Sequence, residues 1–333
     1  MFHRTDSAAF PPRAASSQIM RLLALGLVTL GLLEGQAQAD FIFTTIDDPN
    51  ALSGTVANGI NAQGQIVGTF TNVTQHGFLL SNGAFTTIDA PSGVNGTQAK
   101  GINGLGQIVG TFLDNLGTSH GFLLSSGVLS TIDNPNGVNG TQANGINDLG
   151  QIVGSFFDVD GISHGFLLSN GAFTTIDDPL GANGTTVNGI NNNGQIVGWF
   201  NAANFRTHGF LRSGGVFNTL DVPGGFATMA NGINDNGDVV GRFFGTGTTR
   251  GFLLSGGVYT PINDPNASFG TIANGINSHG EIVGFFVDST GSAHGFLATP
   301  AAAVPEPASV VLLGVGSLIA FGFFRRTRAT VYA

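Results

Sequence analysis

The chain has 333 residues, of which 53 are Gly and only 9% are charged, and it contains no Cys. This composition is too apolar for a disordered protein and too rich in Gly for a helical one, and it excludes disulfide bonds and thiolate chemistry. Between Asp40 and Thr299 there are 17 acidic and 5 basic residues. Such an acidic surface repels phosphate backbones and argues against nucleic acid as a partner.

The first predicted element is an export signal. Met20-Arg21 precedes the apolar run 22–33, and the small-x-small cleavage site Ala37-Gln38-Ala39 follows it. A charged start, a short apolar stretch and such a site are typical of a secretory signal peptide. We therefore assign residues 1–39 to a signal peptide, with Met20 as an alternative start. The apolar run is too short to favour a permanent membrane span.

The region 40–299 is almost entirely repeated. Its triplet Gly-Ile-Asn recurs at intervals of 42 to 44 residues, beginning at Gly59, Gly101, Gly145, Gly189, Gly232 and Gly275. A period in the low forties with strand-like segments indicates propeller blades or a β-solenoid. Each period contains four strand candidates separated by turn signals such as Asn82-Gly83. In the first period these candidates are residues 55–61, 65–71, 76–81 and 84–89.

The two ends of the repeat region distinguish the two folds. The chain enters on residues 41–47, which match the fourth strand alone, and leaves on 294–297, which match the third strand. Pairing them closes a ring without open sheet edges, whereas a solenoid would need polar caps that the sequence lacks. The sequence therefore predicts an all-β, six-bladed β-propeller of four-stranded blades. The N-terminal strand completes the last blade, and the Gly-Ile-Asn strand is innermost.

The repeat resembles the extracellular HAF-type repeat family. The pattern Gly-Ile-Asn…Ile-Val-Gly, as in GINAQGQIVG at 59–68, matches that family, and His-Gly-Phe stands here in place of its His-Ala-Phe triplet. The resemblance covers residues 41–297. It implies an extracellular repeat protein and says little about a ligand.

A second repeated feature is the segment HGFLLSNGAFTTID at 76–89. With a two-residue type I′ turn at Asn82-Gly83, His76 faces Asp89 across the hairpin as a non-hydrogen-bonded pair. The same register pairs His120 with Asp133, His164 with Asp177, His208 with Asp221, Arg250 with Asn263 and, through ring closure, His294 with Asp47.

We interpret these residues as structural cross-strand pairs, because an imidazole beside a carboxylate satisfies both polar groups. A catalytic site is normally singular, whereas this pair is repeated in every blade. A ring of metal or ligand sites and catalysis remain as alternatives. Arg250 fits a metal ring poorly, since Arg is not a usual metal ligand.

The longer connections, between strands two and three and between strands four and one, fall on one face of the predicted ring. Loops on a rigid scaffold usually carry binding, so we expect a ligand there. Asp158-Val159-Asp160-Gly161 is faintly similar to a calcium loop, which makes Ca²⁺ at Asp158 and Asp160 an alternative to a plain turn. No other cofactor is expected. Trp199 is either packed between blades or a platform for a sugar.

The C-terminal segment, 300–333, is predicted to be a sorting signal. Its apolar stretch 308–324 is preceded by a short polar motif and followed by a basic cluster: Pro305, Glu306 and Pro307, then Arg325, Arg326 and Arg328. A plain membrane anchor is one interpretation, because seventeen mostly apolar residues just suffice to span a bilayer. The order of these parts resembles the PEP-CTERM sorting signal. That resemblance implies an exosortase-type partner in the inner membrane of a Gram-negative bacterium.

The sequence thus predicts an exported, exosortase-sorted protein of the cell surface or extracellular matrix, anchored in the membrane only through its tail before processing. No Gly-x-Ser-x-Gly elbow, zinc-ligand spacing or phosphate loop is found, so no catalytic residue is assigned. We expect a non-catalytic binding or structural module associated with exopolysaccharide or biofilm. The alternative is a glycan-active lyase or hydrolase with its site on the long-loop face.

Overall fold

The structure is a computed structural model that describes residues 41–245 and 247–301. All regular structure in these residues is β, in 24 strands. No helix in the described residues is long and apolar enough to cross a membrane. The predicted signal peptide, the Pro-Glu-Pro motif, the apolar stretch 308–324 and the Arg cluster all lie outside the described residues.

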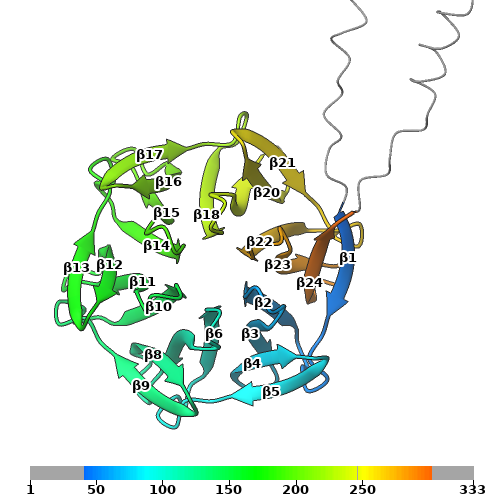
Figure 1. Cartoon of the computed structure of the whole chain (residues 1–333), viewed down its shortest axis with the longest axis horizontal. Helices are drawn as coiled ribbons and strands as arrows, with labels where there is room; N and C mark the ends of the chain where they lie inside the picture. The colour runs from blue at the N-terminus through cyan, green and yellow to red at the C-terminus, as the bar shows by residue number, and fades with distance from the viewer. Residues whose placement is uncertain (1–40, 246, 302–333) are drawn as a thin grey trace, which may run out of the picture. The chain divides into compact units, whose positions relative to one another are not determined.

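The strands form six antiparallel blades around a central axis, with strands β2, β6, β10, β14, β18 and β22 innermost (Figure 1). Blade 1 contains β2 (Thr55–Ile60), β3 (Ile66–Thr71), β4 (Gln75–Ser81) and β5 (Ala84–Ile88). Blade 2 contains β6 (Thr97–Ile102), β7 (Ile108–Leu113), β8 (Ser119–Ser125) and β9 (Val128–Ile132). Blade 3 contains β10 (Thr141–Ile146), β11 (Ile152–Phe157), β12 (Ser163–Ser169) and β13 (Ala172–Ile176).

The second half of the ring follows the same pattern. Blade 4 contains β14 (Thr185–Ile190), β15 (Ile196–Asn201), β16 (Thr207–Ser213) and β17 (Val216–Leu220). Blade 5 contains β18 (Ala227–Ile233), β19 (Val239–Phe244), β20 (Thr249–Ser255) and β21 (Val258–Ile262). Blade 6 contains β22 (Gly270–Ile276), β23 (Ile282–Val287), β24 (Ala293–Pro300) and β1 (Phe41–Ile46). A single parallel pair, Thr249 with Gly270, links the sheets of blades 5 and 6.

The ring closes in the way that the two ends of the repeat region predicted. Strand β1 pairs antiparallel with β24 over its full length, from Phe41 opposite Pro300 to Ile46 opposite Gly295. The first strand of the chain is thereby the outermost strand of the last blade (Figure 1). The six-bladed propeller closed by its N-terminal strand is confirmed.

The outer hairpins have the predicted register. In blade 1, Ser81 lies opposite Ala84 and Leu80 opposite Phe85. The turn residues Asn82 and Gly83 have φ angles of 50° and 78°, and positive φ at both central positions is what a type I′ turn requires. The turn therefore sets which side chains of the two strands face each other.

The antiparallel order gives the ring two unlike faces. The tight turns 61–64 and 82–83 of blade 1, with their equivalents, form what we term the short-turn face. The connections 72–74 and 89–96, with their equivalents, form the long-loop face. Strand β1 begins, and β24 ends, on the short-turn face.

The core consists of apolar clusters between neighbouring blades. Each blade contributes the Phe of its His/Arg-Gly-Phe triplet, which is at most 1% exposed: Phe78, Phe122, Phe166, Phe210, Phe252 and Phe296. The Gly of Ile-Val-Gly makes room for this ring. A Cβ on Gly68 would overlap the Val56 carbonyl oxygen and the Phe78 ring, so only Gly fits there.

Candidate functional site

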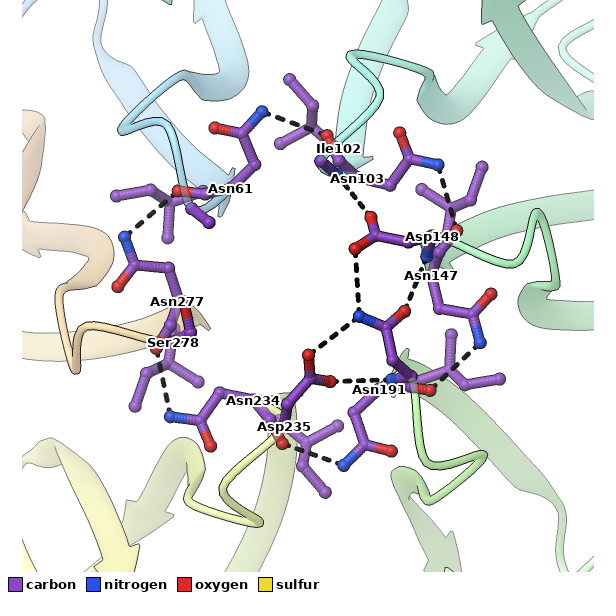
Figure 2. A pocket seen from close by; sticks show the side chains of 18 residues that line it. Asn61, Ile102, Asn103, Asn147, Asp148, Asn191, Asn234, Asp235, Asn277 and Ser278 are labelled. Atoms are coloured by element: carbon purple, nitrogen blue, oxygen red, sulfur yellow. Dashed lines mark hydrogen bonds between the residues drawn. The ribbon is translucent and has the colours of Figure 1, made fainter.

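The buried Asn of each Gly-Ile-Asn triplet joins neighbouring blades at the axis. Nδ2 of Asn61 donates to the carbonyl oxygen of Asn103 at 3.1 Å, and its Oδ1 accepts the N–H groups of Gln63 and Gln65. The same donation continues around the ring at 2.9–3.1 Å through Asn103, Asn147, Asn191, Asn234 and Asn277, whose Nδ2 returns to Asn61 (Figure 2). This closed circle has a structural role that the sequence reasoning missed, although the sixfold recurrence of the Asn was its signal.

The mouth of the axis on the short-turn face carries two carboxylates. Nδ2 of Asn192 donates to Oδ2 of Asp148 at 3.0 Å and to Oδ2 of Asp235 at 2.8 Å (Figure 2). The other oxygens of these carboxylates accept the backbone N–H groups of Gly104 and Asn192. These acids are thus satisfied within the wall of the mouth.

The opposite mouth, on the long-loop face, is lined by a polar ring that we term the axial mouth. It has a volume of about 180 Å³ and is lined by Asn58, Gln98, Lys100, Asn144, Asn188, Asn231 and Asn274. Lys100 replaces the Asn that the other blades carry at this level. Its Nζ donates to Oδ1 of Asn144 at 3.0 Å and to Oε1 of Gln142 at 3.2 Å. Desolvation by burial lowers the pKa of Lys100 to about 8.

The structure brings together five of the six predicted cross-strand pairs. His Nδ1 lies 2.8–3.0 Å from the nearer carboxylate oxygen in the pairs His76–Asp89, His120–Asp133, His164–Asp177, His208–Asp221 and His294–Asp47. No hydrogen bond joins Arg250 to Asn263 in the described residues. Each of the five imidazoles also stacks on a Phe of the preceding strand, as His76 does on Phe70 with ring centroids 5.1 Å apart.

Three of the imidazoles have a second carboxylate, which the sequence reasoning missed. Nε2 of His164 lies 3.3 Å from Oδ2 of Asp158, which is the residue directly after β11. His120 and His294 have the same arrangement with Asp114 at 3.6 Å and Asp288 at 3.5 Å. In blade 1, Oδ1 of Asn72 takes this place at 3.1 Å from His76. The signal was the acid at a fixed place after the second strand.

These contacts shift the protonation equilibria. Burial lowers the pKa of His164, but the hydrogen bonds and charges of Asp177 and Asp158 outweigh it and raise the pKa overall. The hydrogen bond that His294 donates to Asp47, together with the nearby Asp288, raises the pKa of His294 despite partial burial. The Thr290 hydroxyl, the Ser292 and Thr290 N–H groups and His294 lower the pKa of Asp288 to about 2.

The suggested calcium loop is a turn closed by the side chain of Asp158. Oδ1 of Asp158 accepts the N–H groups of Asp160 and Ile162, and its Oδ2 faces His164. Residues 41–245 and 247–301 contain no group of three or more His, Asp or Glu side chains arranged to hold a metal ion. The Asp158 carboxylate is therefore used by its own turn and by His164.

Blade 4 departs from this pattern and contains a pocket that we term the rim pocket. Ala202 follows β15 at the position of Asn72, Asp114, Asp158 and Asp288, so it offers no polar group to His208. Within the described residues, Nε2 of His208 has no hydrogen-bond partner. The pocket has a volume of about 430 Å³ and is lined by Leu180, Phe200, Ala202, Ala203, Asn204, His208, Thr219 and Asp221.

Blades 4 and 5 also hold four of the five Lys and Arg side chains of the described residues, and three of these four have partners of their own. Arg206 donates to the carbonyl oxygens of Gly225 and Phe226 at 3.0 Å. Arg242 donates to Sδ of Met229, and burial lowers its pKa. Arg212 lies over the Phe217 ring. The half-buried Trp199 does not line the rim pocket.

Comparison with known proteins identifies the C-terminal segment and the fold. Residues 303–328 match the PEP-CTERM protein-sorting motif, which implies an exported protein sorted at the membrane by exosortase machinery. No similar sequence was found among curated proteins.

Several solved structures have a similar fold. A triple mutant of AofleA from Arthrobotrys oligospora superposes with a TM-score of 0.50 at 11% identity, covering 77% of this chain and 86% of that one. A point mutant of the Aleuria aurantia lectin in complex with alpha-methyl-L-fucoside has a TM-score of 0.48 at 14% identity, covering 77% and 97%. A gluconolactonase from Xanthomonas campestris has a TM-score of 0.49 at 12% identity, covering 80% and 93%. At such identities the likeness shows the fold alone.

Proposed function

We propose that the chain is a non-catalytic carbohydrate-binding module of the cell surface or extracellular matrix, with exopolysaccharide as its partner and the rim pocket as its binding site. The observation that carries this proposal is the break of the repeat in blade 4. Ala202 stands where four other blades place a side chain against the imidazole, and a cavity lies there beside the pair His208–Asp221.

The walls of the rim pocket suit a sugar ring. Leu180, Ala202 and Ala203 supply apolar lining, which can cover the C–H face of a pyranose. His208, which stacks on the buried Phe200 ring, adds its free Nε2, with Nδ1 held 2.8 Å from Asp221. An imidazole with a fixed neighbour and one free nitrogen is a preorganised hydrogen-bond partner for a hydroxyl group.

The lining also supports binding without catalysis. Asp221 is the only acid that lines the rim pocket, and its carboxylate is engaged by His208. Glycoside hydrolysis generally needs two carboxyl groups on opposite sides of the scissile bond. The rim pocket therefore lacks the groups that a hydrolase would need.

The sorting motif and the repeat support the location. Residues 303–328 direct the chain to exosortase-type machinery. The repeat of residues 41–297 resembles the extracellular HAF-type family, and the segment before Asp40 has the pattern of a secretory signal peptide. Together they favour a protein that is anchored in the inner membrane only briefly and then delivered to the surface or to biofilm matrix.

The test is binding of purified residues 40–303 to exopolysaccharide from a producing Gram-negative strain, with and without calcium, while the length of the polysaccharide is followed. We expect saturable binding without shortening, and a loss of affinity of about tenfold or more in Ala202→Asp. That change restores the repeat and fills the rim pocket. The control Asp114→Asn alters the equivalent loop of blade 2 and should leave affinity unchanged. Shortening of the polysaccharide would show a glycan-active enzyme, and equal binding by Ala202→Asp would exclude the rim pocket.

A further inference from the structure

The axial mouth on the long-loop face is a second concave site, separate from the rim pocket. The inner strands of all six blades bring one side chain each to the same level: Asn58, Lys100, Asn144, Asn188, Asn231 and Asn274. Below this level a smaller cavity of about 80 Å³ is lined by the same ring and by the Gly59 and Ile60 positions of the six strands. The mouth itself has a volume of about 180 Å³, which is room for a small group rather than for a chain of sugars.

The asparagines of this level are largely committed to the fold. Nδ2 of Asn58 donates to the carbonyl oxygen of Ala99 at 2.8 Å, and Nδ2 of Asn274 donates to that of Ala57 at 3.0 Å. Asn144, Asn188 and Asn231 make the equivalent bonds at 2.8–2.9 Å. These bonds join neighbouring blades, so the ring is rigid before any ligand arrives.

Lys100 is the one charged member of the ring, and it lacks a counter-ion. No acidic side chain of the described residues lies within 4.0 Å of its Nζ. Two of its three N–H donors are used, by Asn144 and by Gln142, which leaves one N–H for a ligand. A desolvated ammonium group without an opposite charge is costly, and an anion beside it recovers much of that cost.

Glutamine side chains lie beside Lys100 at the axial mouth. Two positions before Lys100 and Asn144 stand Gln98 and Gln142, whereas the matching positions of blades 1, 5 and 6 hold Val56, Met229 and Ile272. Lys100 is the only titratable group that lines the mouth. The remaining N–H of the Lys100 ammonium is the charged donor that the mouth offers, and a carboxylate group on a small organic body matches it.

We propose that the axial mouth binds a carboxylate, with Lys100 as its charge partner. The carboxylate belongs either to a free small acid or to the uronate unit of an acidic glycan. The excess of acidic residues in the chain repels anions in general. Lys100 supplies the local positive charge that attracts one at the axis. This inference does not rest on the rim pocket, since the two sites share no residue.

The chain itself suggests the matched variants. Lys100→Asn installs the residue that the other five blades carry, so the ring should fold as before. Arg212→Leu removes one positive charge elsewhere and likewise installs the residue found in four other blades, for example Leu80 and Leu124. The full chain, purified in detergent, is titrated calorimetrically with acetate, glucuronate, glucose and a glucuronate-containing oligosaccharide. Ala202→Asp serves as the rim-pocket variant.

We expect wild type, Arg212→Leu and Ala202→Asp to bind a carboxylate probe alike. Lys100→Asn should bind it about tenfold or more weakly, as for a lost hydrogen bond to a charged group. Glucose should not bind at the axis. Binding should weaken as pH rises past about 8, where Lys100 loses its proton. Binding of acetate and glucuronate identifies a free acid as sufficient, and binding of the oligosaccharide alone identifies the glycan as the source. Equal affinity in Lys100→Asn, or no binding of any carboxylate probe to wild type, overturns the proposal.

Discussion

Asp264 tests what a buried, unpaired carboxylate oxygen costs in a connection between two blades. This residue follows β21 and is 4% exposed. Its Oδ1 accepts the N–H of Asn266 at 2.8 Å, whereas its Oδ2 is buried without a partner. Burial raises the pKa of Asp264, against the smaller opposing effects of Asn266 and His294. Blade 2 carries Asn134 at the same position, with the equivalent bond to the N–H of Asn136 at 2.9 Å.

We therefore predict that Asp264→Asn stabilises the protein at pH 7.5. Leaving a buried acceptor unpaired costs roughly 1–3 kcal/mol. The amide keeps the bond to Asn266 and removes the charge, but its NH₂ group also lacks a strong partner, so the lower end applies. The expected gain in the free energy of unfolding is about 1 kcal/mol, or about 2–4 °C in melting temperature.

The pH dependence of this gain has a defined sign. Folding raises the pKa of this carboxyl group above its unfolded value of ~3.9. The protonated group therefore stabilises the fold at pH values below that unfolded pKa. Its contribution is lost as pH rises through the folded value. The gain from Asp264→Asn should therefore be largest at pH 7.5 and small at about pH 3.5.

The assay is urea unfolding of wild type, Asp264→Asn and the reverse change Asn134→Asp at both pH values. The reverse change should cost about 1 kcal/mol at pH 7.5. A variant Asp264→Asn that is no more stable than wild type at pH 7.5, or that gains equally at both pH values, would refute the argument from burial.

Three further changes test the ring. Asp47→Asn removes the main partner that raises the pKa of His294. A His whose pKa is raised by folding stabilises the fold below about pH 6.5, and this contribution is lost as pH rises through the folded pKa. The free energy of unfolding of Asp47→Asn should therefore be lower by about 0.5–1 kcal/mol at pH 6, and by less at pH 8.5. Asn147→Ala removes the Nδ2 bond to the Asn191 carbonyl and should cost about 2 kcal/mol in urea unfolding, against little for the exposed neighbour Leu149→Ala. Gly154→Ala places a Cβ on the Gln142 carbonyl oxygen and the Phe166 ring. It should destabilise by about 3 kcal/mol or more, seen as rapid proteolysis at 25 °C, and normal resistance would contradict the close packing.

The architecture was predictable because the repeat carries it redundantly. An unpaired fourth strand at 41–47 and a missing one after residue 297 left ring closure as the simplest way to satisfy both edges. The Asn82-Gly83 pair fixed the hairpin register, since few residue pairs adopt positive φ at both turn positions. These are local rules, and local rules can be read from a sequence.

The candidate site was harder to predict from the sequence, because it depends on contacts between segments that are far apart in the chain. Asp158 is a turn residue in the sequence, and only the path of its loop places Oδ2 beside His164. Lys100 is a single substitution in a repeated Asn position, and its meaning depends on six strands meeting at one axis. Ala202 matters only as the absence of a side chain that other blades possess. A search for departures from the repeat, rather than for the repeat itself, would have selected both Lys100 and Ala202.

The direction of the two closing strands, β1 and β24, determines on which face of the ring the described chain begins and ends. Strand β1 begins and β24 ends on the short-turn face, so whatever is joined to either end is attached on that side. The axial mouth and the loops around the rim pocket lie on the opposite, long-loop face. The two binding sites proposed above are therefore on the face of the ring that carries neither of these two strand ends.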